Sequence, residues 1–168
     1  MKKLSVILFI WCLPIFLMAQ WVTDNNYGFK INVPSNWSKE TAMDGADKTH
    51  SFSDPTENVY IQKRAFKADG ISADDISQVF ESQYIPTANR AAFEAYTLNN
   101  TPGKFAGYTM HINGLDVGIG AFYAVKNGYG YVVWSMIETK HYNQYSGQGD
   151  AVLNTFTTFA AASKAKAI

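Results

Sequence analysis

The sequence predicts an α+β fold, a three-layer α/β/α sandwich whose central antiparallel sheet has about six strands. Two Asn-Gly dipeptides, Asn113-Gly114 and Asn127-Gly128, lie between apolar segments, and such dipeptides favour two-residue type I′ hairpin loops. The strands around them are apolar on both faces, which predicts cover on both sides. Two further segments repeat apolar residues at helical spacing. Because strands, a helix, more strands and a second helix follow in that order, a parallel dinucleotide-binding fold is excluded.

The N-terminal segment, residues 1–19, has the pattern of a secretory signal peptide. Lys2 and Lys3 precede an apolar run that ends in Leu17-Met18-Ala19-Gln20, which predicts cleavage after Ala19. The run is shorter than the about 20 residues that a spanning helix needs, so we expect removal and no stable membrane anchor. The mature chain is then exported, to the periplasm or the extracellular space.

The mature chain is expected to form one domain, residues 20–159, followed by a frayed Ala- and Lys-containing tail, residues 160–168. The only cysteine, Cys12, lies in the leader, so the mature domain has no disulfide and no Cys-based metal site. The 14 Lys and Arg balance the 14 Asp and Glu, and removal of Lys2 and Lys3 leaves a small acidic excess. Without clustered basic residues, nucleic-acid binding is not expected.

The first elements are short strands. Residues 29–33 alternate apolar and polar side chains up to Pro34, which predicts a half-buried strand. A second extended stretch begins at Trp37, and a short third strand is expected at 51–53. Residues 59–66 give a clearer strand, because Val59, Ile61 and Ala65 alternate with polar or aromatic neighbours. Trp37 is interpreted as a core anchor, and Trp37→Ala is expected to cost about 3 to 5 kcal/mol.

The first helix is predicted over 72–85. Ser72 can cap its free amides and Asp75 completes a capping-box-like start, while Pro86 ends it. Its apolar residues recur at helical spacing and must cover a sheet. A strand near 92–98 follows, and 99–103 is expected to be a turn.

The two Asn-Gly loops predict the register of a three-stranded meander. With loops of two residues, Ile112 faces Leu115, and Lys126 faces Tyr129. One face then carries mostly apolar side chains: Tyr108, Met110, Val117, Ile119, Ala121, Tyr123, Val132, Trp134 and Met136. The opposite face carries Phe105, Gly107, Thr109, Gly118, Gly120, Phe122, Tyr131, Val133, Ser135 and Ile137.

A second helix is expected after Gly147 and Gly149, with Asp150 near its start. Its apolar stripe consists of Val152, Leu153, Phe156 and Phe159, at spacings of three and four. This helix would cover the second face of the sheet.

The order of these elements and two local motifs resemble the PsbP-like superfamily, which includes Mog1-like and DUF1795 proteins. The motifs are Tyr27-Gly28-Phe29-Lys30-Ile31-Asn32-Val33-Pro34-Ser35-Asn36-Trp37 and, much later, Val152-Leu153-Asn154-Thr155-Phe156. The resemblance implies an antiparallel sheet between helices. It also implies a non-enzymatic binding or accessory domain, exported in this case, without transferable site residues.

A shallow trough is the main candidate for a binding site. It is outlined by small residues beside aromatic ones: Gly107, Gly118, Gly120, Phe122, Tyr131 and Ser135. Glycines in strands let a backbone or a ligand approach closely, so either a tightly packed helix or a ligand groove lies there. A core clash in Gly120→Val would favour the packed helix, and preserved stability would favour the groove.

His111 lies opposite Asp116 in the predicted hairpin, which gives two interpretations of this pair. An exposed ion pair contributes only about 0 to 1 kcal/mol, whereas a pH-sensitive ligand contact would have a functional role. His50, His111 and His141 lack the short spacings of a metal motif. No metal or cofactor site is predicted.

The predicted function is therefore an exported, non-enzymatic accessory domain that engages an unidentified protein partner. No nucleophile elbow, paired-carboxylate signature or HExxH motif occurs in the sequence. Two alternatives stay open: a carrier of a small apolar ligand, and an unrecognised hydrolase.

Overall fold

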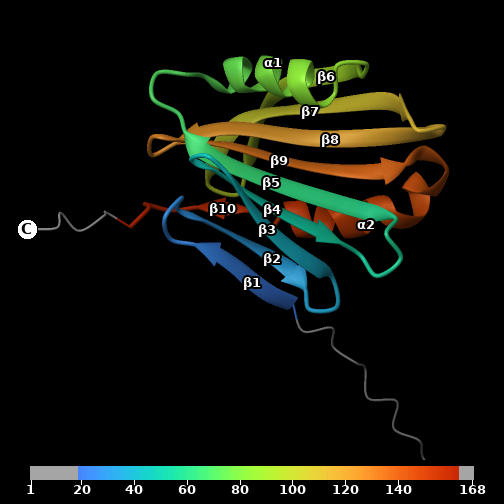
Figure 1. The fold of residues 1–168 in the computed structure, drawn as a ribbon, viewed down its shortest axis with the longest axis horizontal. Coiled ribbons are helices and arrows are strands. Elements are labelled where there is room, and N and C mark those ends of the chain that lie inside the picture. Colours follow the sequence, from blue (N-terminus) through green and yellow to red (C-terminus); the bar gives the residue numbers. More distant parts are fainter. Residues whose placement is uncertain (1–18, 163–168) are drawn as a thin grey trace, which may run out of the picture.

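The computed structural model describes residues 19–162 as two antiparallel sheets and two helices (Figure 1). The expected signal peptide therefore lies outside the described residues except for Ala19, as do residues 163–168 of the expected tail. Neither helix in the described part has the length and apolarity that crossing a bilayer requires.

The larger sheet is antiparallel throughout and has the strand order β3-β4-β5-β9-β8-β7-β6. It therefore has seven strands where the sequence predicted about six. Its strands are β3 (Ser38–Asp44), β4 (Asp47–Ser53), β5 (Val59–Lys67), β6 (Asn89–Leu98), β7 (Thr101–Ile112), β8 (Leu115–Lys126) and β9 (Tyr129–Glu138).

The central meander has the predicted register. Both Asn-Gly pairs have positive φ at each residue, 51° and 81° at Asn113 and Gly114 and 54° and 77° at Asn127 and Gly128, as type I′ turns require. Ile112 pairs with Leu115 and Lys126 with Tyr129. All later pairs follow from these two loops, so the division of side chains between the two faces is also confirmed.

A small second sheet was not predicted. It consists of β1 (Ala19–Asp24), β2 (Phe29–Pro34) and β10 (Thr157–Thr158), with β2 in the centre. In Figure 1 it lies with α2 on one side of the larger sheet, and α1 lies on the other. The layer on this side therefore consists of α2 together with the small sheet.

Helix α1 (Ala73–Tyr84) has the predicted start. The Ser72 hydroxyl accepts the Asp75 amide at 3.2 Å, and the Ser72 amide donates to the Asp75 carboxylate at 2.8 Å. This reciprocal capping box satisfies two amide groups that the first helical turn leaves without partners. Ile76 and Phe80 of α1 are buried against β8 and β7.

Helix α2 (Tyr142–Leu153) begins earlier than predicted. It follows a 3₁₀ turn, η1 (Thr139–His141), directly after β9, so Asp150 lies near its end and not at its start. Phe156 and Phe159 lie beyond the helix. Gly147 and Gly149, which suggested a helix boundary, both lie inside the helix.

The turn between β6 and β7 is shorter than predicted, because only Asn99 and Asn100 form it and residues 101–103 belong to β7. Asn99 has a positive φ of 52°, which Asn tolerates better than most residues. Its side-chain amide donates to the carbonyls of Asn154 and Phe156, both at 2.7 Å. This turn therefore also holds the segment after α2.

The larger core lies between the two sheets and α2. Trp37, 6% exposed, belongs to it, as predicted, and so does Phe156. The Phe156 ring lies 5.7 to 6.4 Å from those of Phe29, Phe122 and Tyr131. One residue from the C-terminal segment therefore joins the small sheet to the large one.

The first residues of the expected frayed tail are held by the turn between β1 and β2. The Phe159 amide donates to the Gly28 carbonyl at 2.8 Å, and the Ala162 amide to the Asn25 carbonyl at 2.7 Å. Gly28 has a φ of +64°, and an added Cβ there would lie 2.3 Å from the Phe159 carbonyl oxygen. Only glycine fits this crossing of two chain segments.

Candidate functional site: the α2 hollow

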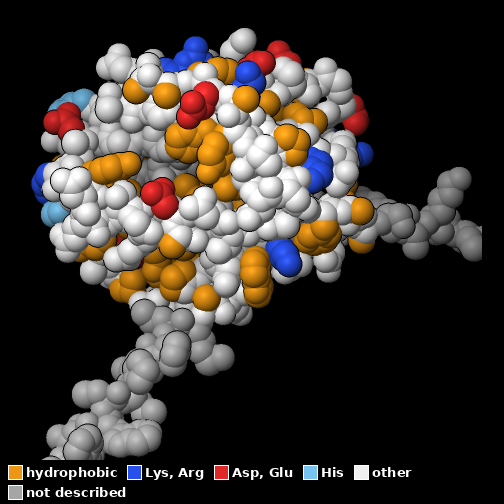
Figure 2. All heavy atoms as spheres, turned by 180° about the vertical axis from the view of Figure 1, so that it is seen from behind, with side chains coloured by type: hydrophobic (Ala, Val, Ile, Leu, Met, Phe, Trp, Pro, Cys, Tyr) orange, Lys and Arg blue, Asp and Glu red, His pale blue; other side chains and the backbone are white. Residues whose placement is uncertain are grey.

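Helix α2 covers only part of its face of the large sheet. It packs mainly on β9, β5 and β2 and contacts β6, β7 and β8 less, so part of the corresponding face of these three strands is left open. The sequence predicted full cover on this side, but α2 starts at Tyr142 and lies over one end of the sheet. Figure 2 shows a hollow on this side of the molecule with hydrophobic side chains gathered beside it.

The floor of this hollow, here called the α2 hollow, is made of the predicted small residues. Gly107 of β7 pairs with Gly120 of β8, which pairs with Ser135 of β9. These three residues and Gly118 line one cavity of about 300 Å³. A Cβ placed on Gly107 would meet nothing within 4 Å, whereas one placed on Gly120 would lie 3.2 Å from the Phe105 ring, so the space is open above Gly107 and covered above Gly120.

One wall comes from a single face of α2. Tyr142, Ser146 and Asp150 line the cavity, and their spacing of four residues places them one above another along the helix. An added Cβ at Gly118 would lie 3.8 Å from the Tyr142 ring, and one at Gly149 would lie 3.9 Å from the Ser135 Cβ, so the helix is close to the floor at these two points.

A second cavity of about 260 Å³ adjoins the first. Phe105, Asp150 and Leu153 line both, so the two spaces share a wall. The second, here called the aromatic pocket, is lined by Glu94, Tyr96, Leu98, Phe105, Phe122, Asp150, Leu153 and Asn154.

The predicted trough residues do not all lie together. Gly107, Gly118, Gly120 and Ser135 line the α2 hollow, and Phe122 lines the aromatic pocket. Tyr131 lines neither, because its ring is fully buried and its hydroxyl donates to the Tyr27 carbonyl at 2.5 Å. That these residues bind a ligand stays a prediction.

His111 and Asp116 face each other across the β7–β8 hairpin, at the paired positions that the sequence predicted. The His111 Nδ1 atom lies 2.8 Å from the Asp116 carboxylate, and both side chains are largely exposed, by 66% and 80%. Neither residue lines the α2 hollow or the aromatic pocket. In this geometry the pair stabilises the hairpin by about 0 to 1 kcal/mol at most.

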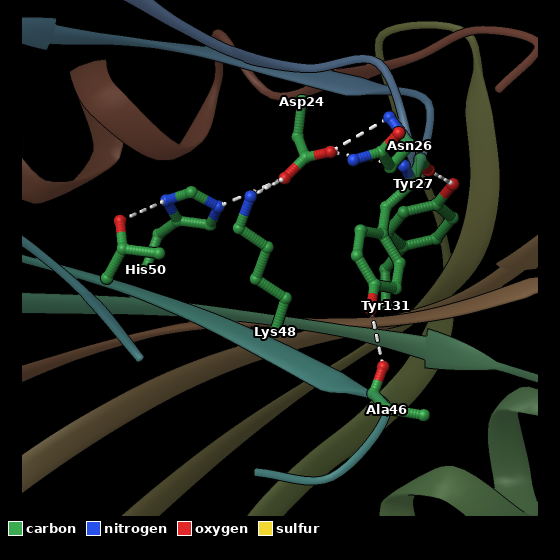
Figure 3. A network of polar contacts seen from close by, with 8 residues as sticks. Asp24, Asn26, Tyr27, Ala46, Lys48, His50 and Tyr131 are labelled. Carbon is green, nitrogen blue, oxygen red and sulfur yellow. Dashed lines mark hydrogen bonds and ion pairs between the residues drawn. The ribbon is translucent and has the colours of Figure 1, made fainter. Parts of the chain in front are cut away.

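A buried polar network at the junction of the two sheets was missed by the sequence analysis (Figure 3). The Asp24 carboxylate of β1 forms an ion pair with the Lys48 Nζ atom of β4 at 2.6 Å. The same carboxylate lies 3.5 Å from His50 Nε2. It also accepts the amides of Asn26 and Tyr27 at 2.9 and 3.2 Å. The network therefore fastens the β1–β2 hairpin to the large sheet.

Burial and neighbouring charges shift the pKa values in this network. Burial alone raises the pKa of Asp24, but the hydrogen bonds from Lys48 and from backbone amides outweigh it, so the net shift is downward. Burial, with the positive charges of Lys63 and Lys48, lowers the pKa of His50 from 6.5 to about 4. His50 is therefore neutral at pH 7 and carries no charge toward Asp24.

Lys63 of β5 is fully buried beside this network. Its Nζ atom lies 3.1 Å from the centre of the Phe29 ring and has no hydrogen-bond partner among residues 19–162. Burial lowers the pKa of Lys63 well below its usual value. One signal could have revealed it, because position 63 falls on the same face as Val59, Ile61 and Ala65 in the alternating pattern of β5.

Comparisons with known proteins identify the fold. No known protein-family profile and no curated protein matches the chain. Among solved structures, it is similar to cyanobacterial PsbP from Synechocystis, with a TM-score of 0.65 and 10% identity over 85% of this chain and 94% of that one. It is also similar to the Ran-binding protein Mog1p of Saccharomyces cerevisiae, with a TM-score of 0.53 and 8% identity over 86% and 97%.

A protein from Bacteroides thetaiotaomicron gives a TM-score of 0.60 at 12% identity, over 83% of this chain and 48% of that one. The chain therefore has the PsbP/Mog1-like fold, and the resemblance seen in the sequence is confirmed at the level of the fold. Sequence identities this low carry the fold alone.

Proposed function

We propose that this protein is an exported, non-enzymatic binding domain that engages a protein partner through the α2 hollow. The observation that carries the proposal is the open glycine floor. An added Cβ would meet no atom within 4 Å at Gly107 and none nearer than 3.8 Å at Gly118, so a partner backbone can approach this part of the sheet closely. The neighbouring Gly120 lies under the Phe105 ring, which an added Cβ would meet at 3.2 Å, so the open part of the floor is at Gly107 and Gly118.

The partner is proposed to be a protein because two cavities lie side by side on this face. They have volumes of about 300 and 260 Å³ and share Phe105, Asp150 and Leu153 as lining residues. An extended segment could occupy both, whereas a compact small molecule would fill one. Among residues 19–162 no group of three or more His, Cys, Asp or Glu side chains is arranged to hold a metal ion.

Export is proposed from the leader pattern together with the first strand. The predicted cut after Ala19 leaves Gln20 as the first mature residue, and Gln20 pairs with Val33 in the small sheet. Cleavage at that position would therefore spare nearly the whole strand. N-terminal sequencing of protein from the native host would test this, and an intact Met1 on the accumulated protein would contradict it.

Site-specific photo-crosslinking tests the partner. A photoreactive residue at Thr109, which is exposed and lines the hollow, should form a crosslink to one partner in the native host. The same residue at Glu40, exposed on the opposite edge of the sheet, is the matched control. Gly107→Val should remove the Thr109 crosslink, because it fills the hollow.

The fold should tolerate Gly107→Val, since a Cβ there meets no atom within 4 Å and Val suits strands. An unchanged melting temperature with loss of the crosslink supports the proposal. Equal crosslinking from Thr109 and Glu40, or a Thr109 crosslink that survives the valine, would overturn it.

A second candidate function, carriage of a small apolar ligand, is favoured by a different cavity. A space of about 260 Å³ lies between α1 and the sheet, lined largely by apolar side chains that include Ile76, Val79, Phe80 and Val132. Mass spectrometry of organic extracts from the purified mature protein tests it. A bound lipid that is lost in Val79→Glu would support this candidate, and a clean extract would contradict it.

A further inference from the structure

The aromatic pocket combines three aromatic rings with two carboxylates. The Tyr96 ring lies 5.9 Å from that of Phe105 and 6.3 Å from that of Phe122. Glu94 precedes Tyr96 by two residues in β6, on the same face, and Asp150 comes from α2. Two carboxylates from separate elements therefore border one aromatic cluster.

These two carboxylates have no basic partner within the described part of the chain. No Lys, Arg or His nitrogen of residues 19–162 lies within 4 Å of Glu94 or Asp150. On the pocket face of the neighbouring strands, His111 is paired with Asp116 and the Lys126 ammonium donates to the Asn100 carbonyl, while the other basic residues of β6 and β7 face the other way. Arg90 pairs with Glu81 at 3.0 Å, and Lys104 lies 3.8 Å from Asp74, both on the α1 side of the sheet.

The pocket is therefore complementary to an organic cation. Ring faces attract cations through their quadrupole, and two nearby negative charges without counter-charge add a favourable potential. A bare divalent metal ion would fit poorly, because Mg²⁺ and Ca²⁺ require about six or more oxygen ligands. A planar guanidinium can stack on a ring while it binds carboxylates with two hydrogen bonds.

We propose that the aromatic pocket binds the guanidinium group of an arginine in an extended segment of the partner, whose backbone lies over the glycine floor. This inference rests on the proposed function and adds the chemistry of the partner. Because the two cavities share Phe105 and Asp150 as lining residues, a side chain in the pocket and a backbone over the floor would be neighbours, which argues for a segment and not for a free ligand. One chain can place its backbone in the hollow and its side chain in the pocket.

NMR titration with two synthetic heptapeptides tests the inference. Both consist of Gly and Ser around one central residue, arginine in the first and its uncharged isostere citrulline in the second. The arginine peptide should bind at least about tenfold more tightly, equivalent to about 1.4 kcal/mol, and shift the amide signals of Glu94, Tyr96 and Asp150. Its affinity should fall as salt rises, because both carboxylates are exposed.

Variants locate the effect. Glu94→Gln combined with Asp150→Asn should remove the difference between the two peptides, whereas Glu40→Gln, exposed on the far edge strand, should preserve it. Thermal unfolding of each variant should match the parent chain, because neither carboxylate makes an ion pair that stabilises the fold. Equal binding of both peptides to the parent chain would overturn the inference.

N-acetyl-arginine amide separates a segment from a free ligand. If it binds as tightly as the arginine heptapeptide, the backbone part of the inference is wrong. A Thr109 crosslink without any preference for arginine would refute this inference and leave the proposed function in place. A preference for arginine without a hollow-specific crosslink would refute the proposed function and leave only the binding of arginine by the aromatic pocket.

Discussion

At the scale of single residues, the most unusual feature is a pair of buried basic side chains whose pKa values the fold lowers. His50 is 6% exposed and Lys63 is fully buried, and burial lowers the pKa of both. A group with a lowered pKa binds fewer protons in the folded chain than in the unfolded one over the pH range in which it titrates. Stability therefore rises with pH wherever either group titrates.

His50 gives a pH-dependent prediction. Its pKa is about 4 in the fold against 6.5 in the unfolded chain, so its contribution is complete above pH 6.5 and is lost as the pH falls from 6.5 to about 4. The loss should be about 2 to 3 kcal/mol, measured as the free energy of unfolding in urea across this range.

The two histidine variants provide the control. His50→Gln should flatten the pH dependence, whereas His111→Gln should leave it as in the parent chain, because His111 is exposed in the β7–β8 hairpin. A flat profile in the parent chain would refute the assignment to His50.

Lys63 gives a second prediction at this scale. Replacing buried ionic groups with apolar residues of similar volume is often neutral or stabilising by about 1 to 4 kcal/mol, and Lys63→Met is expected to stabilise the protein at pH 7, because it removes the desolvation cost of a buried amine. Lys67→Met, at the exposed end of the same strand, should change stability by less than about 0.5 kcal/mol. Loss of stability in Lys63→Met would mean that the lysine is charged and needed by Asp24.

At the scale of elements, the glycines differ in whether there is room for a side chain beside them. Gly147 lies inside α2, and a Cβ there meets no atom within 4 Å. Gly147→Ala should therefore stabilise the protein by about 0.5 to 1 kcal/mol through helix propensity. At Gly103 in β7 the added Cβ would lie 2.2 Å from the Tyr123 carbonyl oxygen.

Gly103→Ala is accordingly expected to destabilise, because the backbone of β7 would have to shift. Both variants should be compared by their urea midpoints at pH 7. If the two midpoints moved in the same direction, the assignment of open and closed space would be wrong.

The predictable elements are those whose boundaries are set by local chemistry. The Asn-Gly loops fix the register of β7, β8 and β9, and Ser72 with Asp75 fixes the start of α1. The start of α2 was mispredicted, because glycine usually lies at a helix end whereas Gly147 and Gly149 lie inside this helix. The strand β10 is two residues long and forms by pairing with β2. The local sequence pattern does not reveal such a distant contact.

The candidate site was also predictable only in part. The glycine floor followed from the hairpin register, since pairing alone aligns Gly107 with Gly120. Its openness did not follow, because that depends on where α2 lies over the sheet. The partners of Asp24 were also beyond the sequence, since Lys48 and His50 come from a strand that pairs with β3 and β5 and not with β1.

At the scale of the whole molecule, two cores are separated by the large sheet and the larger one joins two sheets. Phe156 follows α2 and reaches Phe29 of the small sheet and Phe122 of the large one. A single side chain thus connects three parts that are distant in sequence. The small sheet depends on this contact and on the Asp24 network for its position.

Phe156→Ala is therefore expected to destabilise the whole domain by about 3 to 5 kcal/mol, with one unfolding transition. Phe93→Ala, at a partly buried position on the α1 side, should cost less. Urea unfolding followed by circular dichroism gives both values. A separate early transition in Phe156→Ala would show that the small sheet unfolds independently.

The two outer strands of the large sheet have a consequence for the protein at high concentration. All residues of β3 are exposed, with Lys39, Glu40 and Asp44 among them, and β6 is interrupted by a bulge between Arg90 and Ala92. Charges and bulges on an edge discourage another chain from adding a strand there. The molecule thus carries built-in protection against polymerising edge to edge, although both ends of its sheet are open.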